Sequence, residues 1–360
     1  MKRILLFASV GLLVLGLFVS CENAVEYFTV HFDTDKGSRI ESVIVEKGKT
    51  VSRPNDPTKE GYVFVEWQLD GKGYDFEDVI NNEITLKAIW ERDEKVWDGS
   101  FDISWYESNK GAAEYQLTKA SELAGLAKLV NDGTTNFNGK TIKLANNIDL
   151  ASNEWTAIGN VESYPSITFA GIFDGNNHII SNMSVESKNK NVASAGLFGS
   201  ITGKVQNLTL RNIEVKSTHY AGGIVGYSST NVGMEIKNCH VDGGLITSTP
   251  ELLENKKYDN GDKAGGIIGY MVSGDVVENC TVKNLTVRAY RDIGGLIGCG
   301  AGIIKNNKVL ENVKLIQDDT NGYKDTRPDT IDSIVGRKES GIQFDASNTG
   351  DAAITFIPSR

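Results

Sequence analysis

The sequence has little proline, histidine or cysteine: its 360 residues include 6 prolines, 4 histidines and 4 cysteines. Beyond residue 21 the cysteines are an odd set without C-x-x-C spacing, which argues against a disulfide framework and against a zinc site. Basic residues are outnumbered, with 37 Lys and Arg against 47 Asp and Glu. The chain therefore lacks the positive footprint that nucleic acid or an anionic membrane surface requires. Glycine occurs 38 times, and many tight turns with few prolines are typical of a β-rich repeat protein.

Motifs that identify an enzyme are also missing. No histidine lies in H-E-x-x-H, and the sequence has neither a G-x-S-x-G nucleophile elbow nor a P-loop. We therefore assign no catalytic residue, no metal ligand and no cofactor. Asp149 and Asp174 keep an enzymatic alternative open, because paired carboxylates can act as acid and base in sugar-cleaving enzymes. Both adjoin turns, however, and this favours a structural role.

The first 21 residues have the organisation of a bacterial export signal. Lys2 and Arg3 are a positive start, and residues 4–19 are an apolar stretch too short for a comfortable membrane span. The stretch ends in a small residue before Cys21, which resembles the lipobox of bacterial lipoproteins; an ordinary signal peptide is the alternative. The resemblance implies removal of residues 1–20 and lipid chains on Cys21 that anchor the protein in a membrane. It implies a location at the outer membrane or cell surface, with the side of display left open.

After a tether at residues 21–26, residues 27–92 form a first unit with strand-like alternation at 28–32. A P-T-K-E-G-Y stretch follows, then Trp67, and a closing strand ends in Trp90. This order resembles the Listeria–Bacteroides repeat, also called the internalin B-repeat. The resemblance implies a small β-grasp-like module of secreted and surface proteins. We expect both tryptophans to form the core of a module too small to build one without aromatics, with a ligand platform as the alternative.

Residues 93–117 are expected to be a linker and a first strand, and residues 118–131 a helix. Thr118 can cap the start of this helix, apolar residues recur at i, i+3, i+4 and i+7 from Leu123 onward, and Gly133 supplies the stop. A single amphipathic helix ahead of a repeat array is well placed to cover the exposed end of that array.

Internal repeats dominate the rest of the chain. A glycine–apolar–apolar–glycine element recurs at intervals of about 27 to 43 residues, and two further short strands follow it each time. The copies lie at residues 196–199, 223–226, 266–269, 295–298 and, in degenerate form, 333–336. Three short strands per repeat predict one coil of a right-handed parallel β-helix. The predicted fold class is therefore all-β, with the capping helix and β-helix at 118–345 and a tail or cap at 346–360.

The repeats resemble the GLUG motif family, which is named for this glycine–leucine–bulky–glycine element. Its members are mostly secreted or surface proteins, and some are large adhesins or peptidases that carry the repeats as an accessory stalk. The resemblance brings no shared catalytic residues to this chain.

Equivalent side chains of successive coils should lie over one another at about 4.8 Å. We expect five asparagines to form one ladder at a corner, because asparagine tolerates a left-handed backbone and stacked amides bond to one another. The ladder residues are Asn182, Asn207, Asn238, Asn279 and Asn306. The same stacking places Cys239 and Cys280 about 5 Å apart, within reach of a disulfide. We expect two buried free thiols there and leave a disulfide open.

Two insertions enter the array at the same point, after the third strand of a repeat and before the next glycine element. They span residues 249–263 and 317–330. Insertions in solenoids map to loops on one face, which is often the binding face; tolerated solvent loops are the alternative. The candidate binding residues are Glu254, Lys256, Lys257, Tyr258, Asp259, Asp262, Asp318, Asp319, Tyr323, Lys324 and Arg327. The run from Asp259 to Asp262 lacks the full ligand spacing of a calcium loop.

These observations predict a surface lipoprotein, held to the membrane through Cys21, that acts as an adhesin-like binding module. Its expected partner is a protein or glycan of a host or neighbouring cell, and not nucleic acid. A β-helical polysaccharide lyase or glycosidase is the enzymatic alternative, and a passive structural stalk is a third.

Overall fold

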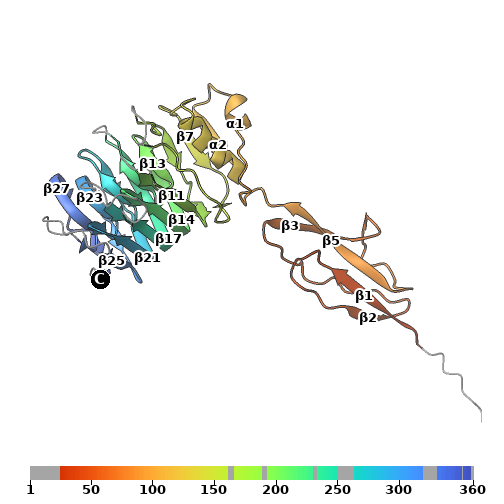
Figure 1. Cartoon of the computed structure of the whole chain (residues 1–360). Helices are drawn as coiled ribbons and strands as arrows, with labels where there is room; N and C mark the ends of the chain where they lie inside the picture. Colours follow the sequence, from red (N-terminus) through yellow and green to blue (C-terminus); the bar gives the residue numbers. More distant parts are fainter. Residues whose placement is uncertain are drawn as a thin grey trace, which may run out of the picture. The chain divides into compact units, whose positions relative to one another are not determined.

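The chain is predominantly β-stranded and divides into two compact units, Met1–Asp93 and Glu94–Arg360 (Figure 1). The computed structural model describes residues 25–160, 166–188, 193–229, 233–249, 263–318, 331–350 and 352–357. The predicted all-β fold with a parallel β-helix is confirmed by large sheets of parallel strands in the second unit.

The first unit is a five-stranded sheet in the order β2-β1-β5-β3-β4. Its strands are β1 (Tyr27–Asp33), β2 (Val43–Glu46), β3 (Tyr62–Leu69), β4 (Lys72–Gly73) and β5 (Ile84–Arg92). Trp67 is 2% exposed and its ring meets that of Phe32 edge to face, with centroids 5.1 Å apart. Trp90 donates its indole N–H to the carbonyl of Thr34. Trp67 is therefore part of the core of the module, and Trp90 is half-buried and packs against that core.

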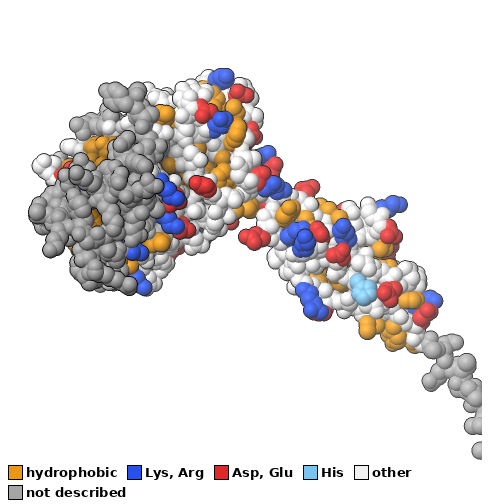
Figure 2. All heavy atoms as spheres, in the orientation of Figure 1, with side chains coloured by type: hydrophobic (Ala, Val, Ile, Leu, Met, Phe, Trp, Pro, Cys, Tyr) orange, Lys and Arg blue, Asp and Glu red, His pale blue; other side chains and the backbone are white. Residues whose placement is uncertain are grey.

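Charged side chains of both signs lie interspersed on the visible surface of this first unit (Figure 2). Many are paired: Lys47 lies 2.7 Å from Glu26, and Lys59 lies 2.9 Å from Asp35. A mixed surface of this kind keeps a small module soluble without creating a field of one sign.

The second unit begins with two helices, α1 (Ser104–Glu107) and α2 (Ala120–Asn131), at the end of the solenoid far from β27 (Figure 1). The predicted apolar stripe of α2 is buried, and Gly133, at φ +70°, ends the helix as expected. The predicted cap was one residue early. The N-cap is Lys119, and the Glu122 carboxylate accepts hydrogen bonds from the backbone N–H groups of Thr118 and Lys119. Glu122 is the third residue of the helix, and its carboxylate binds backbone N–H groups that have no partner within the helix. No capping hydroxyl is therefore needed.

Two parallel sheets build the coils. The smaller one contains β12 (Ser194–Ala195), β15 (Tyr220–Gly222), β18 (Lys263–Gly265), β22 (Asp292–Gly294) and β26 (Ile331–Asp332). The larger one contains β6 (Glu114–Leu117), β7 (Thr141–Leu144), β8 (Ile148–Asp149), β9 (Ile172–Asp174), β10 (Ile179–Ser181), β11 (Ser184–Ser187), β13 (Phe198–Ile201), β14 (Lys204–Ser217), β16 (Val225–Ser228), β17 (Glu235–Ser248), β19 (Ile268–Met271), β20 (Val276–Glu278), β21 (Thr281–Ala289), β23 (Ile297–Lys305), β24 (Lys308–Val309), β25 (Lys314–Asp318), β27 (Val335–Phe344), β28 (Thr349–Gly350) and β29 (Ala353–Ile357).

The glycine elements lie in register from coil to coil. An apolar residue of each element pairs with its counterpart above, in the column Phe198, Val225, Ile268, Ile297 and Val335. The glycines permit close backbone contact: a Cβ added at Gly298 would lie 2.6 Å from the carbonyl oxygen of Gly269. Any larger residue there would push the coils apart, because real Cβ atoms do not approach a backbone oxygen so closely.

The asparagine ladder has two columns, and the prediction of a single column is wrong for Asn182. Four of the predicted residues, Asn207, Asn238, Asn279 and Asn306, occupy equivalent positions of successive coils, with φ between 52° and 57°. Asn182 lies at the next corner, because β10 pairs with Thr209–Arg211 of β14 and not with the stretch before Asn207. Its column continues through Asn212, Gly243, Asn284 and Asn312.

Cys239 and Cys280 occupy equivalent positions of successive coils, since the residues on both sides of them are paired. Both side chains are fully buried in the core, and the cysteines are free thiols. Each thiol is 3.3 Å from the carbonyl oxygen two residues earlier, Lys237 or Glu278. Burial raises the pKa of Cys239 well above its ordinary value.

Asp275 is a fully buried carboxylate that ties two turns together. Its Oδ2 accepts a 2.5 Å hydrogen bond from the Ser228 hydroxyl and a 3.2 Å bond from the N–H of Val272. Its Oδ1 accepts from the N–H of Met234. Burial nevertheless raises the pKa of Asp275 to about 6, because desolvation outweighs these bonds to the charged form.

Candidate functional site

Most of the predicted site residues fall outside the described part of the chain. This applies to Cys21 and to every candidate binding residue except Asp318, which is the last residue of β25. The topology nevertheless fixes where both insertions enter. One connects β17 to β18 and the other connects β25 to β26, so both lead from the third strand of a coil into the smaller parallel sheet.

A cluster of polar and aromatic side chains occupies this corner, and we call it the corner cluster. Its members lie outside the continuous hydrophobic core but are buried or half-buried. They are Tyr220, Tyr227, Lys263, Tyr270, Asp292, Cys299, Arg337 and Glu339. Sequence reasoning missed the cluster. A signal was present, since most members either open the strand before a glycine element or directly follow that element.

Three tyrosines form the aromatic half of the corner cluster. The rings of Tyr227 and Tyr270 are stacked, with centroids 5.5 Å apart and an interplanar angle of 8°. Tyr220 packs against both, at 5.1 Å and 5.6 Å. The Lys263 ammonium lies 5.4 Å from the Tyr220 ring and 5.5 Å from the Tyr270 ring. Burial raises the pKa of Tyr220 to about 12 and lowers that of Lys263. Ring faces attract a cation placed over them, so the lysine holds the stack together.

Arg337 organises the charged half of the corner cluster. Its Nη2 lies 3.3 Å from Oδ2 of Asp292 and 3.3 Å from Oε1 of Glu339. Tyr270 donates its hydroxyl to Glu339 over 3.0 Å. The Cys299 thiol is 3.2 Å from Nε of Arg337, and burial raises its pKa to about 12. A protonated thiol is a poor nucleophile, so the cluster is better suited to recognition than to covalent chemistry.

The flank formed by β14, β17, β20 and β23 has a different character. Its charges alternate and pair along the solenoid: Lys204 with Glu235 at 2.6 Å, Lys237 with Glu278 at 3.8 Å, and Lys305 with Glu278 at 3.1 Å. Such a ladder neutralises itself, and exposed pairs add little to stability. The charges of the corner cluster are also paired, but the cluster adds three packed tyrosine rings, which makes it the stronger candidate for a recognition surface.

Asp149 and Asp174 each accept a hydrogen bond from the first asparagine of one of the two columns. Oδ1 of Asp149 accepts from the Asn182 side chain and from the N–H of Ala151. Asp174 accepts from the side chains of Asn207 and Gln206 and from the N–H of Asn176. Burial raises the pKa of Asp174, but these bonds lower it further, so that the net pKa lies below its ordinary value. As hydrogen-bond acceptors for the first asparagines of the two columns, both residues have contacts that support the structural role expected for them.

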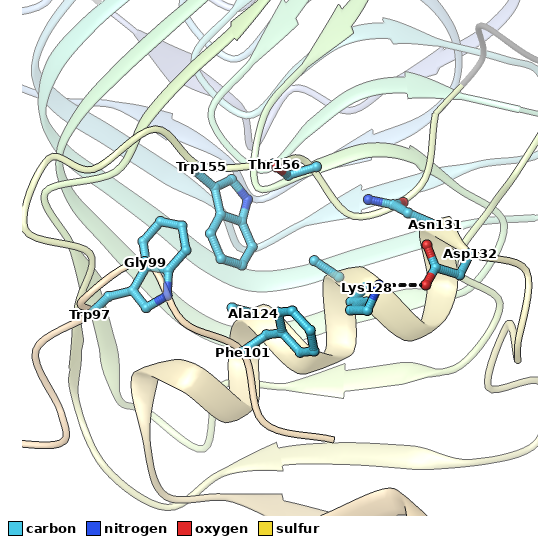
Figure 3. A pocket seen from close by; sticks show the side chains of 10 residues that line it. Trp97, Gly99, Phe101, Ala124, Lys128, Asn131, Asp132, Trp155 and Thr156 are labelled. Atoms are coloured by element: carbon cyan, nitrogen blue, oxygen red, sulfur yellow. Dashed lines mark hydrogen bonds and ion pairs between the residues drawn. The ribbon is translucent and has the colours of Figure 1, made fainter. Parts of the chain in front are cut away.

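A pocket of about 300 Å³ opens beside α2 and is a second candidate site (Figure 3). Trp97 and Trp155 line one side of it, with ring centroids 5.5 Å apart. Their indole N–H groups donate to the carbonyls of Ser100 and Leu197. Phe101 lies over the helix, where the Lys128 ammonium is 4.9 Å from its ring centroid. Sequence reasoning assigned the segment before α2 to a linker, because nothing in it indicates that it folds back over the helix.

Two general features bear on the class of protein. No helix in the described residues is both long and apolar enough to cross a bilayer. The described residues also contain no group of three or more His, Cys, Asp or Glu side chains placed to hold a metal ion. The strand pairing defines the second unit as a parallel β-helix and the first as a small five-stranded sheet.

Comparison with known proteins identifies the first module. Residues 28–89 match the family model of the Listeria-Bacteroides repeat domain. A "Putative membrane protein" of Evansella cellulosilytica is 30% identical over 118 residues, which cover 32% of this chain and 17% of that protein. Halomucin of Haloquadratum walsbyi is 28% identical over 181 residues, 48% of this chain and 2% of that protein. The chain thus spans only a small part of these relatives.

A solved structure also resembles the chain at a low level. It is the crystal structure of a "putative immunoglobulin A1 protease" from Bacteroides ovatus, with 17% identity and a TM-score of 0.41. The match covers 69% of this chain and 84% of that one.

Proposed function

We propose that this protein is a lipid-anchored surface protein that binds an extracellular partner through the corner cluster. The observation that carries the proposal is the gathering of three tyrosines, an arginine and paired charges at the corner into which both insertions lead. Tyrosine and arginine are the residues most enriched at the energetic centres of protein interfaces. A protein is therefore the favoured partner, and a glycan is the alternative.

The setting proposed for this binding is the cell surface. The likeness of the first 21 residues to a lipoprotein leader, with Cys21 as the lipidated residue, supports an anchor. The likeness of the repeats to the GLUG family supports an extracellular role, as do relatives whose names are a membrane protein and a halomucin. The predicted insertion residues, Glu254 to Asp262 and Asp318 to Arg327, remain candidate contacts on the strength of the sequence alone.

The other two classes receive less support. A polysaccharide lyase or glycosidase acting through Asp149 and Asp174 would need one carboxyl that gives up a proton near neutral pH. Asp174 has a lowered pKa and is bonded to Asn207 and Gln206. A passive stalk would not require an arginine and a lysine in a half-buried corner outside the core.

Binding can be tested on the full chain carrying Cys21→Ser, which stays unlipidated. An array of extracellular matrix proteins, mucins and glycans serves as the probe set. We expect at least one protein on the array to bind, and Arg337→Ala to weaken that binding at least about tenfold, a typical loss for an interface anchor. Arg211→Ala is the matched control, because Arg211 lies on the flank, 3.9 Å from Asp242. Equal binding by both variants, or binding to nothing on the array, would contradict the proposal and favour a stalk.

The anchor can be tested separately. Metabolic labelling with a fatty acid should mark the wild-type protein, and the label should be absent from Cys21→Ser. Membrane fractionation should show the labelled wild-type protein in the pellet. Absence of label from the wild-type protein, or equal labelling of the variant, would contradict lipid anchoring at Cys21 but would leave the binding proposal intact.

A further inference from the structure

We propose that the pocket beside α2 binds a single neutral pyranose ring, such as the terminal sugar of a glycan. The pocket is built from the segment around Trp97 and Phe101, from α2, and from the stretch at Trp155 and Thr156 (Figure 3). None of these residues belongs to the corner cluster. The proposal therefore goes beyond the proposed function and does not depend on it.

The size of the pocket limits its occupant. A volume of about 300 Å³ lies at the lower end of the range for small-molecule sites, which run from about 300 to 1,000 Å³. It accepts one sugar ring or a molecule of similar size, and it is too small for a peptide segment with several ordered side chains. A site of this size that recognises a polymer must do so through one terminal unit.

The walls of the pocket favour a ligand with an apolar face. Phe101 is 54% exposed, although a phenyl ring gains by burial, and its ring lies at the mouth of the pocket. Trp97 and Trp155 line the opposite wall, but at 8% and 2% exposed they offer little accessible ring surface, so Phe101 provides most of the stacking area. The C–H groups of a pyranose carry a small positive charge and pack well on the negative faces of aromatic rings. Binding would cover the ring of Phe101 that the free protein leaves in water.

The polar groups favour a neutral ligand with adjacent hydroxyls. The Lys128 ammonium is 2.8 Å from Oδ2 of Asp132, so the two charges cancel (Figure 3). Asn131 is already used: its Oδ1 accepts from the N–H of Gly159 and its Nδ2 donates to the carbonyl of Ala157. Within the described part of the chain, Oδ1 of Asp132 and the hydroxyl of Thr156 have no hydrogen-bond partner.

A lysine and an aspartate side by side offer one donor and one acceptor, which is what a pair of neighbouring hydroxyls requires. An anionic sugar would instead need a cation that is not already paired, because the Asp132 carboxylate would repel it. The geometry thus selects a neutral hexose over a uronic or sialic acid.

The experiment uses the full Cys21→Ser chain and a set of simple glycosides. Saturation-transfer NMR and titration calorimetry are carried out with the methyl glycopyranosides of glucose, galactose and mannose. Methyl glucuronide and N-acetylneuraminic acid are the anionic arms. At least one neutral glycoside should show transfer to its ring protons, with a Kd of about 1 mM, as expected for a ligand with so few atoms.

Two variants test whether the pocket binds the sugar through specific side chains or is only a gap in the packing. Phe101→Ala and Asp132→Asn should each weaken binding of the neutral glycoside at least fivefold, and both positions are exposed enough to tolerate the change. Phe344→Ala is the control, because Phe344 is an exposed phenylalanine of the last long strand, β27, and is not a pocket residue. No transfer to any neutral glycoside, equal binding by Phe101→Ala, or a preference for the anionic sugars would each overturn the proposal. None of these outcomes bears on binding at the corner cluster.

Discussion

The side-chain amide of Asn238 donates a 3.0 Å hydrogen bond to the amide oxygen of Asn207, its counterpart one coil earlier. Asn279 continues the chain with a 3.2 Å bond to Asn238. All three residues have a left-handed backbone, at φ of 52° to 57°. The same residue type thus provides both the bend at the corner and the bond between coils.

Replacing Asn238 separates these two contributions. Asn238→Ala removes both amide bonds and places an alanine at φ 52°, so we expect a loss of about 2 kcal/mol in the free energy of unfolding. Asn238→Gly loses the same bonds but tolerates the backbone, and should cost about half as much. Urea denaturation of both variants provides the measurement. Equal losses for the two would show that the backbone conformation contributes nothing.

The buried carboxylate of Asp275 predicts a pH dependence of stability. Its pKa is raised from 3.8 to about 6 in the folded state, so the folded protein binds this proton more tightly than the unfolded chain. Lowering the pH from 7 to 4 should therefore stabilise the wild-type protein relative to Asp275→Asn by about 2 to 3 kcal/mol. The stabilisation is lost as the pH rises through 6. If the free energies of unfolding of the two proteins change equally with pH between 7 and 4, the predicted pKa shift is refuted.

The three described thiols should be inert in the native state. Cys239, Cys280 and Cys299 are buried, and burial raises the pKa of Cys239 and Cys299. We expect no reaction with a thiol reagent in buffer and reaction of all three in concentrated urea, measured on the Cys21→Ser chain. Mass spectrometry provides the check on oxidation state. A mass lower by two hydrogens would reveal a disulfide between the stacked pair.

Gly125 in α2 predicts a severe steric effect. A Cβ at this position would lie 1.9 Å from the carbonyl oxygen of Asp102, so Gly125→Ala must displace either the helix or the segment that crosses it. We expect a loss of about 3 kcal/mol, even though alanine favours a helix. Gly111→Ala is a suitable control, since its nearest neighbour is 4.0 Å away. Equal melting temperatures for the two variants would contradict the packing described for α2.

Much of the architecture could be predicted from sequence because the repeats carry local signals. Each glycine element and each Ile-x-Asn or Val-x-Asn stretch specifies one corner of a coil. The error at Asn182 shows the limit of this reasoning. Ile180-Ser181-Asn182 matches the pattern before Asn207, but strand pairing places it at the next corner of the coil. A local pattern cannot distinguish two corners that both require a left-handed asparagine.

The candidate sites were harder to predict because they depend on contacts between distant segments. Tyr270 and Glu339 are separated by 69 residues in the sequence and yet share a hydrogen bond. Phe101 and Lys128 meet only because the chain before α1 folds over α2. No periodicity marks either pair, since each depends on which coil lies over which.

The corner cluster also has a consequence for how such a protein can diversify. Four of its side chains directly follow the last glycine of an element, and they occupy one position in successive coils: Tyr227, Tyr270, Cys299 and Arg337. An aromatic ring, a thiol and a guanidinium group thus occupy equivalent positions without altering the pairing of the strands that carry them. A point mutation at such a position changes one side chain of the corner cluster while the backbone of the coil keeps its shape. A lineage can therefore acquire new binding partners through single, independent substitutions.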